Sequence, residues 1–178
     1  MDQEKVRVLL IEDNPTVALV LEGLLEAAPV TEYVVTTVGS LTEAREQLVQ
    51  QTWEVVLLDL VLPNGEGIEL VRRVKALAPD VPLVIVTATD DEELAVQAIR
   101  ERAQDYLVKG QFDGPTLVRT LRRARERQKA EVRFRLVRET LAHVDRPVAQ
   151  LQQLSQENPP PPTRPNQRTA APNPPPRP

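Results

Sequence analysis

The sequence predicts a doubly wound α/β fold, in which helices cover both faces of a five-stranded parallel sheet. Two observations support this prediction. Five short apolar segments, rich in β-branched residues, recur along about the first 125 residues, as expected for strands buried on both faces. Between them lie segments whose apolar residues have helical spacing. Such an alternation is typical of βαβ crossovers.

The five predicted strands are apolar along most of their length, with turn residues between them. In chain order they are Val6–Ile11, Tyr33–Val38, Val55–Asp59, Pro82–Thr87 and Asp105–Lys109.

The helices are predicted from spacing and from their end signals. Pro15 suits the first turn of the first helix, and Ser40 with Glu43 forms the capping box of the second. Pro79 and Pro82 end the third helix. The apolar positions at helical spacing are Val17, Leu21, Leu24 and Leu25; Leu41, Ala44 and Leu48; Ile68, Val71, Val74 and Leu77; Leu94 and Ala98; and Leu117, Leu121 and Ala124.

Composition narrows the class of protein. The chain has 178 residues, no Cys and one Trp, which suits one domain with an appendage and excludes disulfides and thiolate chemistry. The first residues mix charges with a short apolar run, so neither a signal peptide nor a membrane span is expected. We therefore expect a cytoplasmic protein without membrane contact.

Charge and proline divide the chain into three parts. Residues 1–118 carry 9 Lys/Arg and 21 Asp/Glu, whereas residues 119–178 carry 13 and 5. Ten of the 17 prolines lie between Pro159 and Pro178, in a stretch too poor in apolar residues to offset its ordering entropy. The predicted organisation is a domain at 5–127, a helical extension or linker at 128–157 and a disordered Pro-rich tail at 158–178.

Carboxylates end two of the strands. Glu12 and Asp13 follow the first strand, and Asp59 ends the third. In a flavodoxin-like strand order of 2-1-3-4-5 these ends are neighbours at the topological switch point, where such sheets bind ligands. Three carboxylates that close would repel one another unless a cation lay among them. Hard oxygen ligands without His or Cys favour Mg²⁺.

Two further strand ends complete this edge. Thr87 offers a hydroxyl at the end of the fourth strand, and Lys109 offers an ammonium at the end of the fifth. Carboxylates, a metal ion, a hydroxyl and a cation together suit a phosphoryl group. Asp59 is then the nucleophile that accepts it.

On these residues the chain resembles the receiver domains of two-component response regulators. The matching motifs are "ED" (Glu12, Asp13), "DLVLPNGEG" with Asp59, "TA" with Thr87, and "DYLVK" with Tyr106 and Lys109. The likeness covers roughly residues 5–127.

The resemblance implies a role for each of these residues. It implies that a histidine kinase or phosphotransfer protein phosphorylates Asp59, with Mg²⁺ held by Asp13, Asp59, the Val61 carbonyl and, partly through water, Glu12. Thr87 and Lys109 would contact the phosphoryl group, and Thr87 and Tyr106 would form a switch. The output would be protein–protein contact, and the protein would not be an enzyme beyond phosphorylating and dephosphorylating itself.

One residue departs from the family pattern, and two alternative functions stay open. Gly110 stands where the family usually has a proline with a cis peptide bond, so a looser turn is expected. One alternative is a Mg²⁺-dependent phosphatase that forms an aspartyl phosphate, although Val61 stands where such enzymes generally carry a second acid/base. The other is the receiver fragment of a larger hybrid kinase or regulator whose output domain is missing.

The last helix is predicted to run about 30 residues, or about 45 Å, up to Pro147. Between Arg119 and Arg138 the sequence has nine basic residues but only two acidic residues, Glu126 and Glu131. A solvated or dimerising helix is the favoured interpretation, with a possible homodimer through this helix, followed by pairing with the acidic domain surface. Nucleic-acid binding is not expected because no helix-turn-helix is recognisable. His143 lies in a stretch that only faintly resembles a histidine-kinase phosphoacceptor box.

Overall fold

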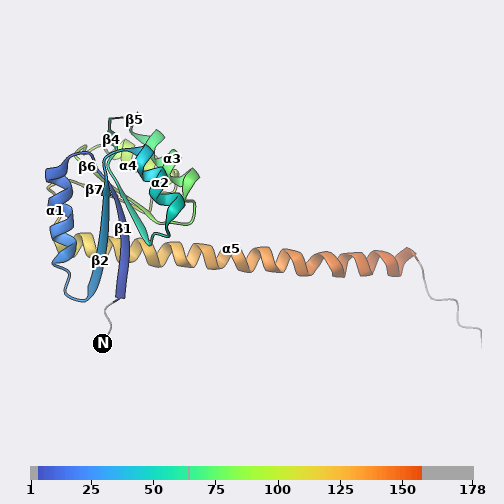
Figure 1. Cartoon of the computed structure of the whole chain (residues 1–178). Helices are drawn as coiled ribbons and strands as arrows, with labels where there is room; N and C mark the ends of the chain where they lie inside the picture. The colour runs from blue at the N-terminus through green and yellow to red at the C-terminus, as the bar shows by residue number, and fades with distance from the viewer. Residues whose placement is uncertain (1–3, 64, 158–178) are drawn as a thin grey trace, which may run out of the picture. The chain divides into compact units, whose positions relative to one another are not determined.

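A five-stranded parallel sheet forms the centre of the fold (Figure 1). The computed structural model describes residues 4–63 and 65–157, and side chains as far as residue 142. The strand order is β2-β1-β3-β6-β7, which confirms the predicted 2-1-3-4-5 pattern. The bounds are Glu4–Ile11 for β1, Thr31–Val38 for β2, Val55–Leu58 for β3, Leu83–Thr87 for β6 and Asp105–Val108 for β7.

Five helices alternate with these strands in the described residues. They are α1 (Pro15–Glu26), α2 (Leu41–Gln50), α3 (Ile68–Leu77), α4 (Glu92–Arg100) and α5 (Gly114–Glu157). The second helix is capped as the sequence predicts: the Ser40 hydroxyl accepts the Glu43 N–H, and the Glu43 carboxylate accepts the Gly39 N–H. This pair satisfies two backbone donors that the helix cannot bond itself.

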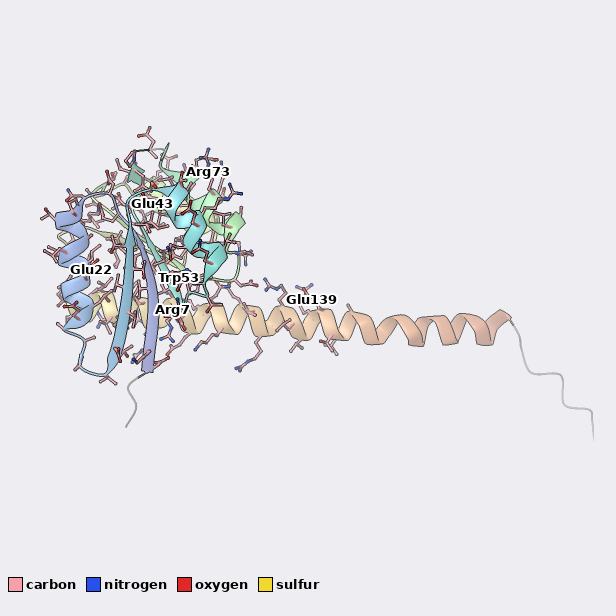
Figure 2. All side chains as sticks on the ribbon, viewed as in Figure 1. Arg7, Glu22, Glu43, Trp53, Arg73 and Glu139 are labelled. Carbon is pink, nitrogen blue, oxygen red and sulfur yellow. The ribbon has the colours of Figure 1, made fainter. Side chains whose placement is uncertain are left out.

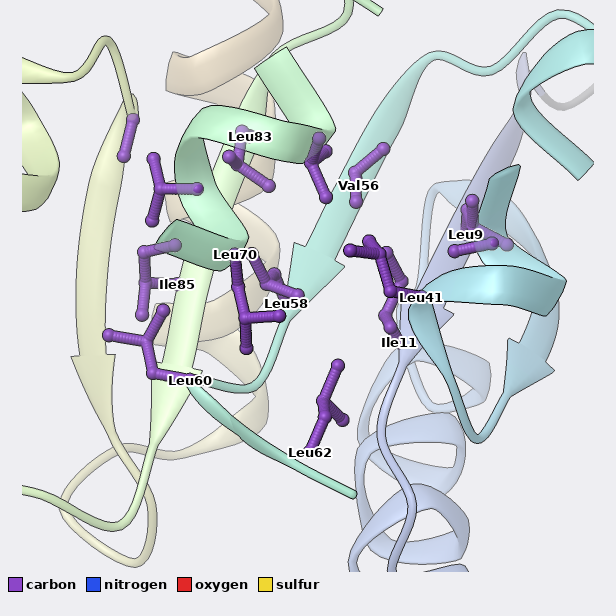
Figure 3. Packing of buried hydrophobic residues seen from close by; sticks show 14 of the residues in the cluster. Leu9, Ile11, Leu41, Val56, Leu58, Leu60, Leu62, Leu70, Leu83 and Ile85 are labelled. Atoms are coloured by element: carbon purple, nitrogen blue, oxygen red, sulfur yellow. The ribbon is translucent and has the colours of Figure 1, made fainter. Parts of the chain in front are cut away.

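Two hydrophobic layers hold the helices to the sheet. One layer joins α2, α3 and α4 to one face through residues such as Leu41, Leu70 and Ala98, packed on Ile11, Leu58 and Ile85 (Figure 3). The other joins α1 and the first turns of α5 to the opposite face. Because successive strand residues point to opposite faces, each strand serves both layers. β3 is accordingly buried along its whole length.

A small ribbon follows β3 that sequence reasoning did not predict. Strands β4 (Val61–Leu62) and β5 (Gly65–Glu66) pair antiparallel, directly after Asp59. Leu60 and Leu62 are buried there and extend the core under the loop (Figure 3). Two-residue strands are too short to produce a detectable alternating pattern in the sequence.

The long C-terminal helix is confirmed, and it extends past Pro147. α5 has 44 residues and ends at Glu157, so it is longer than the length of about 30 residues expected from the apolar spacing. A proline removes one backbone hydrogen bond, and a helix can continue beyond it around a local kink. By its contacts the chain divides into residues 1–136 and 137–178. The predicted Pro-rich tail at 158–178 lies outside the described residues.

One aromatic contact fixes the end of the sheet where the strands begin. The Arg7 guanidinium lies 5.1 Å from the centre of the Trp53 ring (Figure 2), within the range of a cation–π interaction. The indole N–H of Trp53 donates to the Gln47 carbonyl at 3.0 Å. Trp53 therefore has a fixed position between α2 and β3.

Among the described residues, no helix is both long and apolar enough to cross a membrane.

Candidate functional site

Three carboxylates meet where β1 and β3 end, as the sequence predicts. Glu12 and Asp13 follow β1, Asp59 follows β3, and their carboxylate oxygens lie within 4.8 Å of one another. The backbone sets this proximity: the Asp59 N–H donates to the Ile11 carbonyl at 3.0 Å, which continues the sheet ladder by one residue. Glu12 and Asp59 are only 3% and 5% exposed, whereas Asp13 faces solvent.

Lys109 joins the two buried carboxylates. Its Nζ lies 2.6 Å from Glu12 Oε2 and 2.6 Å from Asp59 Oδ2, at the end of β7. Burial alone would lower the pKa of Lys109, but the hydrogen bonds that its ammonium donates to Asp59 and Glu12, together with the charges of these carboxylates, outweigh burial and raise the pKa above its usual value. The ammonium therefore stays charged and offsets the charge of carboxylates that would be costly to bury alone.

The remaining oxygens of the buried carboxylates have backbone donors. Glu12 Oε1 accepts the Asn14 N–H at 3.0 Å, and Asp59 Oδ1 accepts the Val61 N–H at 3.3 Å. Asn14 is also the N-cap of α1, where its side chain accepts the N–H groups of Thr16 and Val17. The start of α1 and the ribbon after β3 are thus both tied to the acidic site.

Thr87 and Tyr106 lie on the neighbouring strands β6 and β7. Thr87 is fully buried, and its hydroxyl oxygen accepts the Thr89 N–H at 3.4 Å. The Tyr106 hydroxyl donates to the Thr89 carbonyl at 2.6 Å. Burial raises the pKa of Tyr106, as do the charges of Asp91 and Asp90. Thr89 therefore connects Thr87 and Tyr106 through its two backbone groups, a link that the residue types alone did not predict.

The turn after Lys109 is shaped by glycine. Gly110 has φ +81°, a left-handed conformation that residues with a Cβ adopt at a cost. The next residue, Gln111, donates from its side-chain amide to Asp90 at 3.2 Å, which links this turn to the loop before α4. At the position where the family usually has a proline, the turn of this chain therefore depends on the positive φ of Gly110.

The donor set fits a hard divalent cation. Carboxylate oxygens from Asp13, Asp59 and Glu12 are close enough to share one ion, and Asp13 is open to solvent on one side. Neither His nor Cys lies among these ligands, which favours Mg²⁺ over a transition metal. The exposed side leaves room for the water molecules that Mg²⁺ retains.

An α/β domain with this strand order, an acidic cluster at the switch point and a lysine at the last strand end defines a class of signalling domains. The comparison with known families gives the same result, because residues 8–122 match the Response regulator receiver domain. The chain belongs to this family, which confirms the family and fold predicted from the motifs. Receiver domains are generally not enzymes that act on other substrates, and the phosphatase alternative is not favoured.

Two curated relatives are similar in sequence to the receiver domain of this chain. The C4-dicarboxylate transport transcriptional regulatory protein DctD of Rhizobium meliloti is 34% identical over 131 residues, which make up 74% of this chain and 28% of DctD. The transcriptional regulatory protein ZraR of Escherichia coli K12 is 32% identical over 124 residues, 70% of this chain and 27% of ZraR. The chain thus spans little more than a quarter of the length of these relatives.

A solved structure agrees with the fold. The response regulator receiver domain protein from Clostridium thermocellum is 27% identical, and the match has a TM-score of 0.62. It covers 70% of this chain and 98% of that chain. The similarity therefore extends over a whole receiver domain.

Proposed function

We propose that residues 5–127 act as a phosphorylation-controlled switch in which Asp59 accepts a phosphoryl group from a histidine kinase or phosphotransfer protein. The observation that carries the proposal is the position of Asp59, which lies beside Glu12 and Asp13 with Lys109 Nζ at 2.6 Å. An aspartate that served only as a turn residue at a strand end would not be expected to have two further carboxylates and a lysine around it. The position two residues after Asp59 is Val61, 55% exposed, so no second acid/base is placed for hydrolysis of other substrates.

In the proposed step, a carboxylate oxygen of Asp59 attacks phosphorus and forms an O–P bond. The N–P bond of the donor phosphohistidine breaks, and its electron pair stays on the imidazole nitrogen, which takes a proton from water. Lys109 holds a positive charge where negative charge gathers on the transferred oxygens. Bound at Asp13, Asp59, the Val61 carbonyl and, partly through water, Glu12, Mg²⁺ would neutralise further phosphoryl charge.

Thr87 and Tyr106 are proposed to convert this step into a change of shape. The buried Thr87 hydroxyl is bonded to the Thr89 N–H, so contact with a phosphoryl group on Asp59 requires the loop after β6 to move. That loop also holds Tyr106 through the Thr89 carbonyl. Its movement would release the Tyr106 hydroxyl and change the surface formed by α4 and β7, where an output partner can bind.

Labelling with acetyl phosphate tests the acceptor. The full chain with Mg²⁺ is expected to gain one acid-stable phosphate, and Asp59→Asn is expected to gain none. Asp80→Asn is the matched control, because Asp80 is an exposed carboxylate paired with Arg135 outside the acidic cluster. Undiminished labelling of Asp59→Asn would place the acceptor elsewhere, and many turnovers of a small phosphate ester would indicate an enzyme.

We also propose that a second copy of the chain pairs along the part of α5 beyond residue 136. Val137 and Leu141 are 51% and 58% exposed, and the sequence continues their spacing with Val144, Val148 and Leu151. Alternating steps of four and three residues are the pattern of a two-stranded coiled coil. The side chain of His143 lies outside the described residues, and its role stays a prediction.

Sedimentation equilibrium tests this pairing. The full chain is expected to sediment as a dimer, and a variant with Val137→Asp and Leu141→Asp as a monomer, because charges at the seam would be buried unpaired. Val49→Asp is the control, since Val49 is 75% exposed on α2. A monomeric full chain would contradict the proposal.

We further propose a cytoplasmic location, where histidine kinases present their phosphoryl groups.

A further inference from the structure

A pocket lies at the end of the sheet opposite the acidic site. Its volume is about 520 Å³, within the range of small-molecule sites. Trp53 and Pro82 contribute from the segments just before β3 and β6, and Val132 and Leu136 contribute from α5. Because the strands are parallel, their starts meet at this end and their carboxyl ends meet at the phosphorylation site. The two sites therefore share no residue.

The walls of the pocket are apolar and partly rigid. Trp53 is held by its hydrogen bond to the Gln47 carbonyl and by the Arg7 guanidinium 5.1 Å from its ring. Pro82 adds a second side chain without rotational freedom, since its ring is closed. Val132 and Leu136 supply aliphatic surface from successive turns of α5. Such walls match a ring or a short hydrocarbon chain.

The polar lining carries an excess of donors. Arg125, Lys129 and Arg133 line the pocket, against Glu54 and Asp80. Both acids have other contacts, because Asp80 pairs with Arg135 at 2.7 Å and Glu54 accepts the Arg7 N–H at 2.8 Å. Within the described residues, the ion pairs involve neither Lys129 nor Arg133, although the charge of Lys129 contributes to the lowered pKa of Glu4. The pocket therefore has a positive character.

Two buried donors of the lining have no acceptor in the described part of the chain. They are Arg125 Nε and Gln128 Nε2. Arg125 uses Nη2 to bond Glu4 at 2.6 Å, and Gln128 uses its oxygen to accept the Gln104 amide at 3.2 Å. Buried donors are rarely left unbonded in native proteins. A ligand with acceptor oxygens would bond them after a small adjustment of these two side chains.

We propose that this pocket binds a small amphipathic carboxylate, with its apolar body against Trp53 and Leu136 and its carboxylate among Arg125, Gln128 and Lys129. A monoanion suits the site better than a phosphate dianion, because less charge has to be desolvated beside apolar walls. The bound molecule would connect α5 to the strand starts at β3 and β6. It would thereby stabilise the segment of α5 that leads out of the receiver domain.

The only Trp in the chain gives a direct test. With 4-phenylbutyrate as the probe, the full-length chain is expected to show a saturable change in Trp53 emission at concentrations below about 10 mM. The uncharged 4-phenylbutyramide is expected to bind at least about tenfold more weakly, because it lacks the charge that the basic lining recognises. No saturable change with the acid, or equal binding of the amide, would overturn the proposal.

Variants locate the binding. Lys129→Gln with Arg133→Gln removes two exposed charges from the lining and is expected to weaken probe binding by about tenfold or more. Arg123→Gln is the matched control, because Arg123 is exposed on the same helix but does not line the pocket. An unchanged affinity in the double variant would overturn the proposal. So would an affinity that falls as protein concentration rises, since a second copy of the chain would then fill the pocket.

Discussion

Buried carboxylates need a cation nearby, and Lys109 is the cation that the fold supplies to Glu12 and Asp59. Its Nζ lies 2.6 Å from both side chains. Replacing Lys109 by Met keeps most of the side-chain volume but leaves two carboxylates without their ion pair. We expect Lys109→Met to lower the free energy of unfolding by about 3 kcal/mol in metal-free buffer, measured by urea denaturation. A loss below about 0.5 kcal/mol would contradict the importance of this ion pair.

The pKa of a second lysine, Lys75, is shifted in the opposite direction from the pKa of Lys109. Lys75 on α3 is 8% exposed, and its Nζ donates to the Val81 carbonyl at 2.9 Å. Burial, with a further contribution from Arg102, lowers the pKa of Lys75 to about 8. The unfolded chain therefore binds more protons than the folded chain between pH 8 and the ordinary value of 10.5. In that window the Lys75 contribution makes the fold more stable as the pH rises.

Lys75→Met tests this assignment. The variant is expected to be more stable than the parent at pH 7, by about 1 to 3 kcal/mol, because the cost of burying the charged ammonium disappears. The advantage is expected to shrink between pH 8 and pH 10, where the parent loses its proton. Urea denaturation of both proteins at each pH gives the difference directly. A difference that does not vary with pH would show that Lys75 keeps an ordinary pKa.

At the scale of elements, two glycines with different backbone conformations give predictions of opposite sign. Gly23 lies inside α1 and Gly110 has φ +81°, and an added Cβ would meet nothing within 4 Å at either position. Gly23→Ala is expected to stabilise the fold by about 0.5 to 1 kcal/mol through helix propensity. Gly110→Ala is expected to destabilise it by about 1 to 2 kcal/mol through backbone strain. Thermal unfolding would measure both, and equal signs would contradict the argument.

The elements also show what could be predicted from the sequence. The strand ends carrying Glu12, Asp59, Thr87 and Lys109 were predictable, because a strand buried on both faces is an apolar run in the sequence and its end is the first polar residue. The β4–β5 ribbon was not predictable, because each of its strands has only two residues. The length of α5 was underestimated from the apolar spacing, because a proline usually marks a helix end, whereas this helix continues beyond Pro147 to Glu157.

The sequence predicted the places of residues in the fold better than it predicted which side chains contact one another. The sequence placed Glu12 and Lys109 at the same edge, but their direct ion pair depends on how far each side chain reaches. Likewise, the basic face of α5 was favoured as a solvated or dimerising surface, with pairing to the acidic domain as the second interpretation. The structure shows such pairs for part of this face, since Arg125 lies 2.6 Å from Glu4 and Arg135 lies 2.7 Å from Asp80, whereas Arg123 and Lys129 are exposed. Charge counts do not reveal which opposite charges will be neighbours.

For the molecule as a whole, occupancy of the acidic site is linked to global stability. A ligand that binds the folded state at ten times its Kd stabilises it by about 1.4 kcal/mol. We therefore expect saturating Mg²⁺ to raise the melting temperature by about 3 °C relative to NaCl of equal ionic strength. The shift is expected to disappear in Asp13→Asn, because Asp13 is the exposed member of the cluster. An equal shift in that variant would contradict the assigned ligands.

The hydrogen bond from Tyr106 to the Thr89 carbonyl has a thermodynamic consequence. A single neutral hydrogen bond at a partly exposed position contributes about 1 kcal/mol net. If this bond were the main difference between two positions of the ring, the bonded position would be favoured only about fivefold. On that condition, a signal would need to supply little free energy to reverse the preference, and about one molecule in six would hold the alternative arrangement at rest.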